Sequence, residues 1–280
     1  MGKVRSFLTR MGEEPPFRLF TKAIVKRSPV SIRTKARWDV VARPHYLVGV
    51  LEAADEALRE GVKEISVFEF GVAGGNGLLA LGQYSEAIQR ETGIKIAVYG
   101  FDSGKGLVEL SGDYRDHPDQ WQSGDYPMDE AALRKRLVPN TTLIVGNISE
   151  TVPKHLPKIS EPIGFISVDV DTYSATREVL KLFRLPQVRK LRLVVMYFDD
   201  VDLIFNHNFA GELLAINEFN DSDGGVKIDP WRGVGKHRPF PDSPWLRRMF
   251  IAHDLKAISN FRADRKSKLI GIDDQTGATG

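Results

Sequence analysis

The chain has 280 residues, of which 42% are hydrophobic, and a formal net charge of +2. This length and composition predict one large α/β domain, and the small net charge makes a nucleic-acid partner unlikely. The absence of cysteine excludes disulfides, thiolate metal ligands and a cysteine nucleophile. No apolar run reaches the roughly 18 residues of a membrane span, so we expect a cytoplasmic protein without membrane contact.

The first 44 residues are the most basic part of the chain. They contain eleven lysine and arginine residues against three acidic residues. Such an extension could dock an acidic partner, a phosphate-bearing substrate or RNA. It could equally be a solvated arm that packs on the domain or on a second subunit, which leaves a homo-oligomer open.

A strand, a glycine-rich turn and a helix follow a first amphipathic helix. The spacing of apolar residues predicts that first helix over 45–60, with Gly61 as its stop. Residues 65–70 are branched and aromatic without helical spacing, which predicts a strand buried on both faces. Residues 76–90 return to a helical pattern. The order of these elements is typical of a nucleotide-binding unit.

The glycine-rich turn has residues suited to a bound ligand. Gly71, Gly75 and Gly77 can take positive φ angles and let a ligand approach the backbone. Glu69, at the strand end, can accept hydrogen bonds from the ligand or order the turn. The stretch from Gly75 to Ala80 also matches the pattern GxGxxA, so the turn alone does not separate a nicotinamide cofactor from S-adenosylmethionine.

Two further strand ends add candidate cofactor contacts. The strand predicted at 96–101 ends in Asp102 and Ser103, where an acid can bind a ribose hydroxyl pair or simply form a turn. A third strand, predicted at 142–146, brings Gly146 and Asn147 to the same edge. A backbone N–H or the asparagine side chain there could bind an adenine ring, although Gly-Asn is also a common turn pair.

A long polar segment separates these two strands. Residues 104–127 contain the large side chains of Tyr114, His117, Trp121 and Tyr126. A loop of this length inside a compact domain indicates a lid or a binding loop, with a disordered insertion as the alternative. A helix is predicted after it, over 129–137.

Pairs of acids follow the next two strands. The strand at 163–168 ends in Asp169 and Asp171, and the strand at 191–198 ends in Asp199 and Asp200. A helix at 175–185 connects them, so the crossover lays the strands parallel and both acidic ends at one edge of the sheet.

Four neighbouring carboxylates favour a bound cation. Like charges raise one another's pKa values, and a divalent ion relieves the repulsion. Oxygen ligands without cysteine or paired histidine favour Mg²⁺, Mn²⁺ or Ca²⁺ over Zn²⁺. A nearby carboxylate could then deprotonate a substrate hydroxyl. Alternatively, these acids cap helices or pair with Arg177 and Arg192.

Four motifs resemble the macrocin O-methyltransferase family, which consists of class I, S-adenosylmethionine-dependent and Mg²⁺-dependent methyltransferases of natural-product sugar hydroxyls. The motifs are Glu69-Phe-Gly-Val-Ala-Gly-Gly-Asn-Gly77, Phe101-Asp-Ser-Gly-Lys-Gly-Leu107, Asp169-Val-Asp-Thr-Tyr-Ser-Ala-Thr176 and Asp199-Asp200. The resemblance covers about residues 66–220. It implies a Rossmann-like doubly wound sheet, Asp169, Asp199 and Asp200 as metal ligands, and Asp171 as general base or further ligand. Asp169 and Asp171 are therefore the first candidates for catalysis.

The chain departs from this family after the acid pair. Val201 stands where the family has tyrosine, and a longer stretch, 202–208, includes His207, a candidate base or substrate contact. The last two strands are predicted near 226–228 and 249–253. A basic aromatic loop between these strands could cover the acceptor or a partner subunit.

The sequence thus predicts a basic extension at 1–44, a methyltransferase-like α/β domain at 45–262 and a tail at 263–280. The expected activity is methyl transfer from S-adenosylmethionine to a hydroxyl of a small molecule, with Mg²⁺, Mn²⁺ or Ca²⁺. Three alternatives remain: a nicotinamide oxidoreductase, an RNA methyltransferase, and a binding protein without catalysis.

Overall fold

The computed structural model describes residues 17–107, 110 and 112–262. The tail predicted at 263–280 and the first sixteen residues of the extension lie outside this part of the chain. Seven strands form one sheet, and they are β1 (Glu64–Phe70), β2 (Lys95–Asp102), β3 (Thr141–Val145), β4 (Ile163–Val168), β5 (Lys190–Phe198), β6 (Val226–Pro230) and β7 (Met249–Asp254). The seven strands predicted from the sequence are all present.

The sheet has the strand order β3-β2-β1-β4-β5-β7-β6. Strands β1 to β5 pair in parallel, and β7 lies antiparallel between β5 and β6. Because β1 and β4 are central neighbours and the chain order reverses between them, their carboxyl ends open a crevice at this edge. The Rossmann-like doubly wound sheet predicted from the sequence is confirmed.

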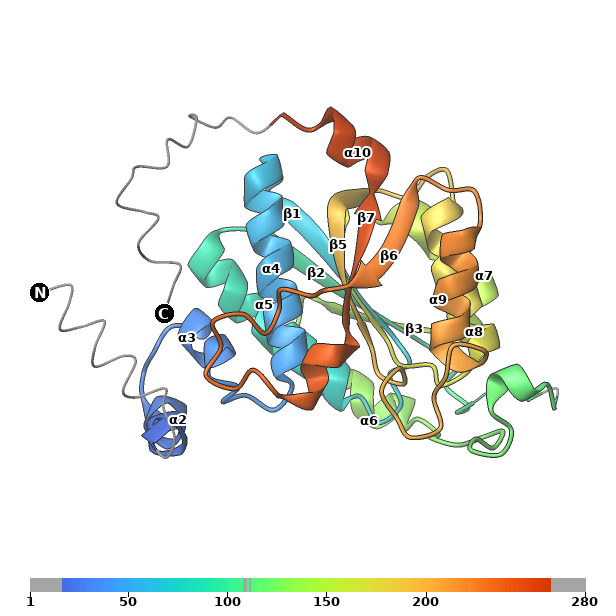
Figure 1. The fold of residues 1–280 in the computed structure, drawn as a ribbon, viewed down its shortest axis with the longest axis horizontal. Helices are drawn as coiled ribbons and strands as arrows, with labels where there is room; N and C mark the ends of the chain where they lie inside the picture. The colour runs from blue at the N-terminus through green and yellow to red at the C-terminus, as the bar shows by residue number, and fades with distance from the viewer. Residues whose placement is uncertain (1–16, 108–109, 111, 263–280) are drawn as a thin grey trace, which may run out of the picture.

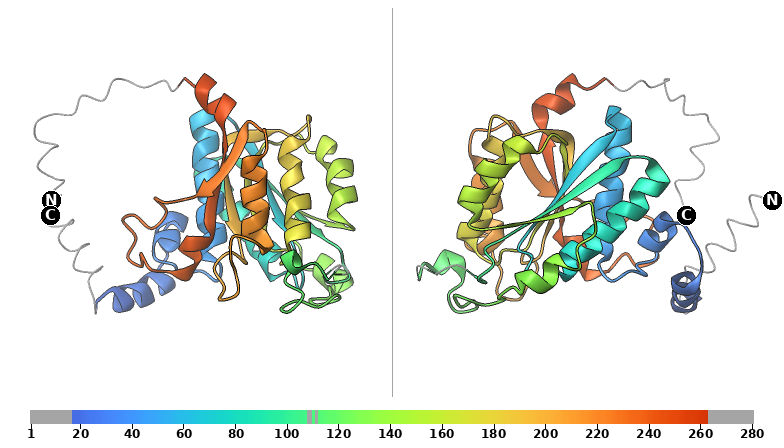
Figure 2. Two further views of the ribbon diagram at one scale, coloured as in Figure 1. Left: turned by 45° about the vertical axis from the view of Figure 1, so that its right-hand side comes forward. Right: turned by 180° about the vertical axis from the view of Figure 1, so that it is seen from behind.

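Helices cover both faces of the sheet (Figure 1). Helices α4 (Pro44–Glu60) and α5 (Asn76–Thr92) lie on one face, whereas α7 (Ile148–His155), α8 (Tyr173–Leu180) and α9 (Gly211–Asp221) lie on the other, as Figure 2 shows from behind. The remaining helices are α2 (Phe17–Arg27), α3 (Ile32–Arg37), α6 (Glu130–Arg134) and α10 (Leu255–Asn260). None of these described helices has the length and apolar character needed to cross a membrane.

The side chains of β1 alternate between two hydrophobic cores. Ile65 and Val67 pack with α4 and α5, while Phe68 and Phe70 pack with α7, α8 and α9. All four are fully buried. A strand covered on both faces loses the strict apolar-polar alternation, which is why β1 has apolar side chains on both of its faces.

Helix α7 was not predicted from the sequence. Asn147 begins it by accepting a hydrogen bond from the backbone N–H of Ser149, and Pro153 lies inside the helix. Proline in a helical segment breaks the usual sequence pattern. The asparagine at the end of β3 is therefore a helix cap as well as a candidate ligand contact.

The N-terminal extension packs on the domain through its described residues. The Arg238 side chain donates to Asp39 at 2.6 Å, and Trp38 contacts the ring of Phe240 edge-on. Trp245, from the same loop, packs in the core beside α4. The basic aromatic loop thus covers α4 and the extension, and none of its residues lines the cavity described below.

Candidate active site

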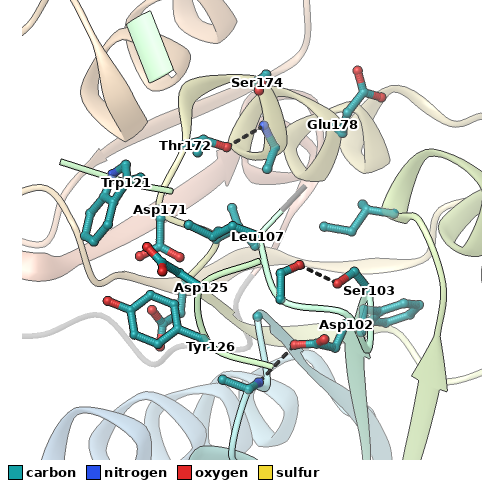
Figure 3. Close-up of a pocket in the computed structure, with 18 of the residues that line it drawn as sticks. Asp102, Ser103, Leu107, Trp121, Asp125, Tyr126, Asp171, Thr172, Ser174 and Glu178 are labelled. Atoms are coloured by element: carbon teal, nitrogen blue, oxygen red, sulfur yellow. Dashed lines mark hydrogen bonds between the residues drawn. The ribbon is translucent and has the colours of Figure 1, made fainter. Parts of the chain in front are cut away.

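A cavity of about 860 Å³ opens at the carboxyl edge of the sheet (Figure 3). Its lining includes nine of the thirteen residues predicted as site residues, namely Gly71, Asp102, Ser103, Gly146, Asn147, Asp169, Asp171, Asp199 and Asp200. The other four, Glu69, Gly75, Gly77 and His207, do not line it. The structure therefore brings the ends of β1 to β5 to one site.

Gly71 forms the closest contact between β1 and β4 at this edge. Its φ angle is 84°, and a Cβ atom at this position would lie 1.6 Å from the carbonyl oxygen of Asp169. Only glycine combines the positive φ angle with this close approach. The glycine turn thus lies directly against the backbone of Asp169, which carries the first carboxylate of the site.

Asp102 orders the glycine turn from the end of β2. One of its carboxylate oxygens accepts hydrogen bonds from the backbone N–H groups of Val72 and Ala73, at 2.8 and 2.9 Å. The other oxygen accepts from the N–H of Gly104 at 2.7 Å. A carboxylate has about four lone-pair positions, so one remains for a ligand hydroxyl.

Glu69 lies beneath the turn instead of in the cavity. Tyr46 donates to its carboxyl group at 2.7 Å, and Ser167 donates to Tyr46 at 2.9 Å. Gly77 packs against the same carboxyl group, since a Cβ atom there would lie 1.9 Å from Glu69 Oε1. Gly75 begins α5 with a φ angle of 81°. The turn is thus shaped by Glu69, Gly75 and Gly77. For Glu69, this is the second of the two roles that the sequence left open.

Burial raises the pKa of Glu69 to about 8. The unfolded group titrates near 4.5, so this carboxyl group favours the folded state at low pH, and that contribution is lost as the pH rises from about 4.5 through about 8. The variant Glu69→Gln does not lose stability in this way, because a glutamine side chain does not ionise. Between pH 5 and pH 9, we expect its free energy of unfolding to gain more than about 1.4 kcal/mol relative to wild type.

Urea unfolding at both pH values, with a chelator present, measures this difference. Glu64→Gln, which removes an exposed carboxylate from the same strand, is the matched control. Parallel pH profiles for wild type and Glu69→Gln would show that Glu69 is ionised in the folded state at neutral pH.

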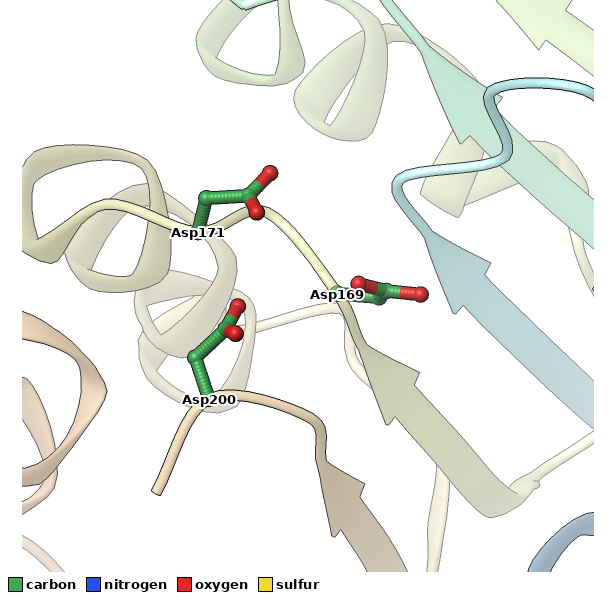
Figure 4. A group of neighbouring side chains, drawn as sticks. All are labelled: Asp169, Asp171 and Asp200. Atoms are coloured by element: carbon green, nitrogen blue, oxygen red, sulfur yellow. The ribbon is translucent and has the colours of Figure 1, made fainter. Parts of the chain in front are cut away.

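Three carboxylates gather where β4 and β5 end (Figure 4). Asp169, Asp171 and Asp200 each offer an oxygen within 4.8 Å of the others. Burial, together with neighbouring carboxylates, raises their pKa values to about 8, 7 and 8. Asp200 is only 5% exposed, and its Oδ2 atom has no hydrogen-bond partner among the described residues. A hard divalent cation fits this donor set, because it would supply the missing positive charge.

Asp199 lies outside this group, which differs from the predicted ligand set. Its Oδ1 atom accepts hydrogen bonds from the Tyr197 hydroxyl at 2.5 Å and from Arg248 at 2.9 Å. The ion pair with Arg248 already balances its charge. The structure thus groups Asp171, instead of Asp199, with Asp169 and Asp200.

The arginines considered as alternative partners lie elsewhere. Arg192 forms ion pairs with Glu56 and Glu60 at the opposite end of β5. Arg177 lies 3.9 Å from Glu218 and over the ring of Tyr173. Neither neutralises the three grouped carboxylates.

No family model and no curated protein matches this sequence. Among solved structures, the calicheamicin methyltransferase CalS11 is similar, with a TM-score of 0.51 and 19% identity over 79% of this chain and 90% of that chain. The O-methyltransferase TomG of Streptomyces achromogenes also matches, with a TM-score of 0.43 and 12% identity over 84% and 94% of the two chains. The chain has a class I methyltransferase fold. Within this fold, the cavity lies at the carboxyl ends of the parallel strands, beside the glycine turn.

His207 does not line the cavity of this methyltransferase fold. It is exposed, its Nδ1 atom accepts from the backbone N–H of Phe209, and its ring lies 5.5 Å from that of His117. The proposed catalytic role of His207 therefore has no support in the geometry. From the sequence, only its residue type and its nearness to the acid pair were known, and in the structure its side chain is exposed.

The segment predicted as a lid contributes to the cavity wall. Trp121, Asp125 and Tyr126 line the cavity near Asp171 (Figure 3). Asp116 anchors the segment, since it accepts hydrogen bonds from the backbone N–H and the hydroxyl of Ser174 at the start of α8. Trp121 and Tyr126 were noted from the sequence as large side chains of this segment. Asp116 and Asp125 were not, because acids are common in polar loops.

Proposed function

We propose that this protein is an S-adenosylmethionine-dependent O-methyltransferase that acts on a hydroxyl of a small molecule, as in the macrocin O-methyltransferase family. The observation that carries the proposal is the shared cavity. The glycine turn and the ends of β2 and β3 form one part of its wall, and the three grouped carboxylates form another. A methyl donor and a hydroxyl acceptor need such adjacent sites, because transfer requires the methyl group and the oxygen in line.

The donor is proposed to bind along the ends of β1, β2 and β3. Gly71 lets it approach the backbone, and Asp102 retains one acceptor position for a ribose hydroxyl. The Ser103 hydroxyl donates a hydrogen bond to the Gly106 carbonyl at 2.6 Å. This bond stabilises the turn over residues 103–106 at the cavity wall. Gly146 and Asn147, which also line the cavity, are proposed to contact the adenine.

Asp169, Asp171 and Asp200 are proposed to hold Mg²⁺, with Mn²⁺ or Ca²⁺ as substitutes. When bound, such an ion lowers the pKa of an acceptor hydroxyl. Asp171 is also the proposed proton acceptor, as the resemblance implies, and it lies in the loop after β4 with a φ angle of 62°. A strained aspartate is held there only because the surrounding structure fixes it. Asp199, paired with Arg248, positions the end of β5.

Three observations favour this function over an RNA methyltransferase or a nicotinamide oxidoreductase. The described residues that line the cavity include no lysine, arginine or histidine, so an RNA backbone finds no cationic contact there. A nicotinamide oxidoreductase would leave the grouped carboxylates without a role. The similarity to a calicheamicin methyltransferase supports a small-molecule acceptor.

Calorimetry with S-adenosylmethionine, NAD and NADP, each with and without Mg²⁺, tests the donor assignment. We expect binding of S-adenosylmethionine alone among the three. Binding of NAD or NADP in its place would overturn the proposal. Transfer of a radiolabelled methyl group to a panel of hydroxyl compounds then separates an enzyme from a binding protein.

A further inference from the structure

The cavity wall is strongly acidic. It includes seven carboxylates, at Asp102, Asp125, Asp169, Asp171, Glu178, Asp199 and Asp200. Most of them have a partner or a proposed role. Asp102 accepts from backbone N–H groups, Asp199 pairs with Arg248, and Glu178 pairs with Lys181 at 2.5 Å. The three grouped carboxylates are the proposed metal ligands.

Asp125 is the carboxylate that remains. One of its oxygens accepts a hydrogen bond from the backbone N–H of Gln122 at 3.0 Å, and no basic side chain pairs with it in the described part of the chain. It lies close to Asp171, and the two carboxylates repel each other. A negative group in this position favours a cationic ligand over an anionic one.

Two aromatic side chains accompany Asp125. Trp121 lines the cavity. Tyr126, directly after Asp125, is 53% exposed although it is a large aromatic residue, and its φ angle is 60°. Aromatic faces beside a carboxylate are the usual surroundings of a bound ammonium group.

We propose that Asp125, Trp121 and Tyr126 form a binding site for a cationic amine, and that the methyl acceptor is an amine-bearing hydroxyl compound. The ammonium group lies against the two aromatic rings and the Asp125 carboxylate, while the hydroxyl faces Asp171. The same charges should weaken the binding of acceptors that carry a phosphate or a carboxylate. This inference rests on the proposed function for the hydroxyl and the donor.

Three catechols of different charge test the inference. Dopamine is cationic, 4-methylcatechol is neutral and 3,4-dihydroxyphenylacetate is anionic at neutral pH. Calorimetry on the full chain with Mg²⁺ and S-adenosylhomocysteine should show dopamine binding about tenfold more tightly than the neutral compound, which corresponds to about 1.4 kcal/mol. The anionic compound should bind least. Equal affinities, a preference for the anion, or no binding of dopamine would overturn the inference.

The variant Asp125→Asn should abolish most of the preference for dopamine and leave the affinity for 4-methylcatechol unchanged. Asparagine keeps the oxygen that accepts from Gln122, so the loop retains this hydrogen bond. Asp119→Asn, in the same segment but outside the cavity wall, is the matched control. A second variant, Trp121→Leu, should weaken the binding of dopamine more than the binding of 3,4-dihydroxyphenylacetate.

Separate titrations with S-adenosylhomocysteine and with S-adenosylmethionine, each without a catechol, measure donor binding. If wild type does not bind S-adenosylhomocysteine, the proposed function itself fails. If it binds the donor product but does not discriminate the catechols, only the amine site fails. If Asp125→Asn weakens the binding of S-adenosylmethionine as much as the binding of dopamine, the site binds the donor's sulfonium group, and the inference is wrong.

Discussion

The variant Asp200→Asn should reduce the rate of methyl transfer about 10³-fold. Asparagine has nearly the same shape but lacks the negative charge that holds the proposed ion. Asp200 is buried and its Oδ2 atom has no partner in the described structure, so the substitution breaks no ion pair. Its backbone N–H donates to Glu212, and this contact is kept. The rate of methyl transfer from radiolabelled donor measures the effect.

A loss of activity in Asp200→Asn should not arise from unfolding. The burial of an unpaired carboxylate costs stability, so we expect the metal-free variant to melt at the same temperature as wild type or higher. The increase in Tm that Mg²⁺ produces in wild type should disappear in the variant. Asp202→Asn, in which an ion pair with Arg247 is lost near the same loop, is the control. Full activity in Asp200→Asn would contradict the proposed metal site.

The variant Gly71→Ala should lose about 3 kcal/mol of unfolding free energy or more. The methyl group would lie 1.6 Å from the carbonyl oxygen of Asp169, and both atoms belong to rigid backbone. The φ angle of 84° adds the strain of a left-handed conformation. Relief requires β1 and β4 to separate at the site, so donor binding should be lost along with stability.

Gly74→Ala is the matched control for Gly71→Ala. It lies in the same turn, and a Cβ atom there has no neighbour within 4 Å. We expect this variant to change the unfolding free energy by less than about 0.5 kcal/mol. Urea unfolding of both variants without ligand makes the comparison. Equal stabilities would show that the turn adjusts to a side chain, against the rigid contact described above.

The sheet was largely predictable because its signals are local. The strand at 163–168 was predicted with the bounds that β4 has, since it is rich in branched and aromatic residues and an acid follows directly. The parallel crossover through α8 then placed Asp169 and Asp200 at one edge without further information. Helix α7 was missed because its cap and its proline are each ambiguous when read along the chain.

The partners of the acids could not be predicted in the same way. Asp199 and Asp200 are adjacent in sequence, yet Arg248, just before β7, pairs with Asp199 and leaves Asp200 unpaired. Likewise, Tyr46 on α4 fixes Glu69 beneath the turn. Each of these contacts joins residues that the sheet brings together from distant parts of the chain.

The sequence by itself determined the order of the elements, the glycine turn and the supply of carboxylates at the strand ends, because strand and turn preferences depend on near neighbours. Only the tertiary structure decided that Asp171 joins Asp169 and Asp200, that His207 lies outside, and that Asp125 faces the cavity. The direction and the charge partner of a side chain depend on residues packed against it, and packing exists only in the folded chain.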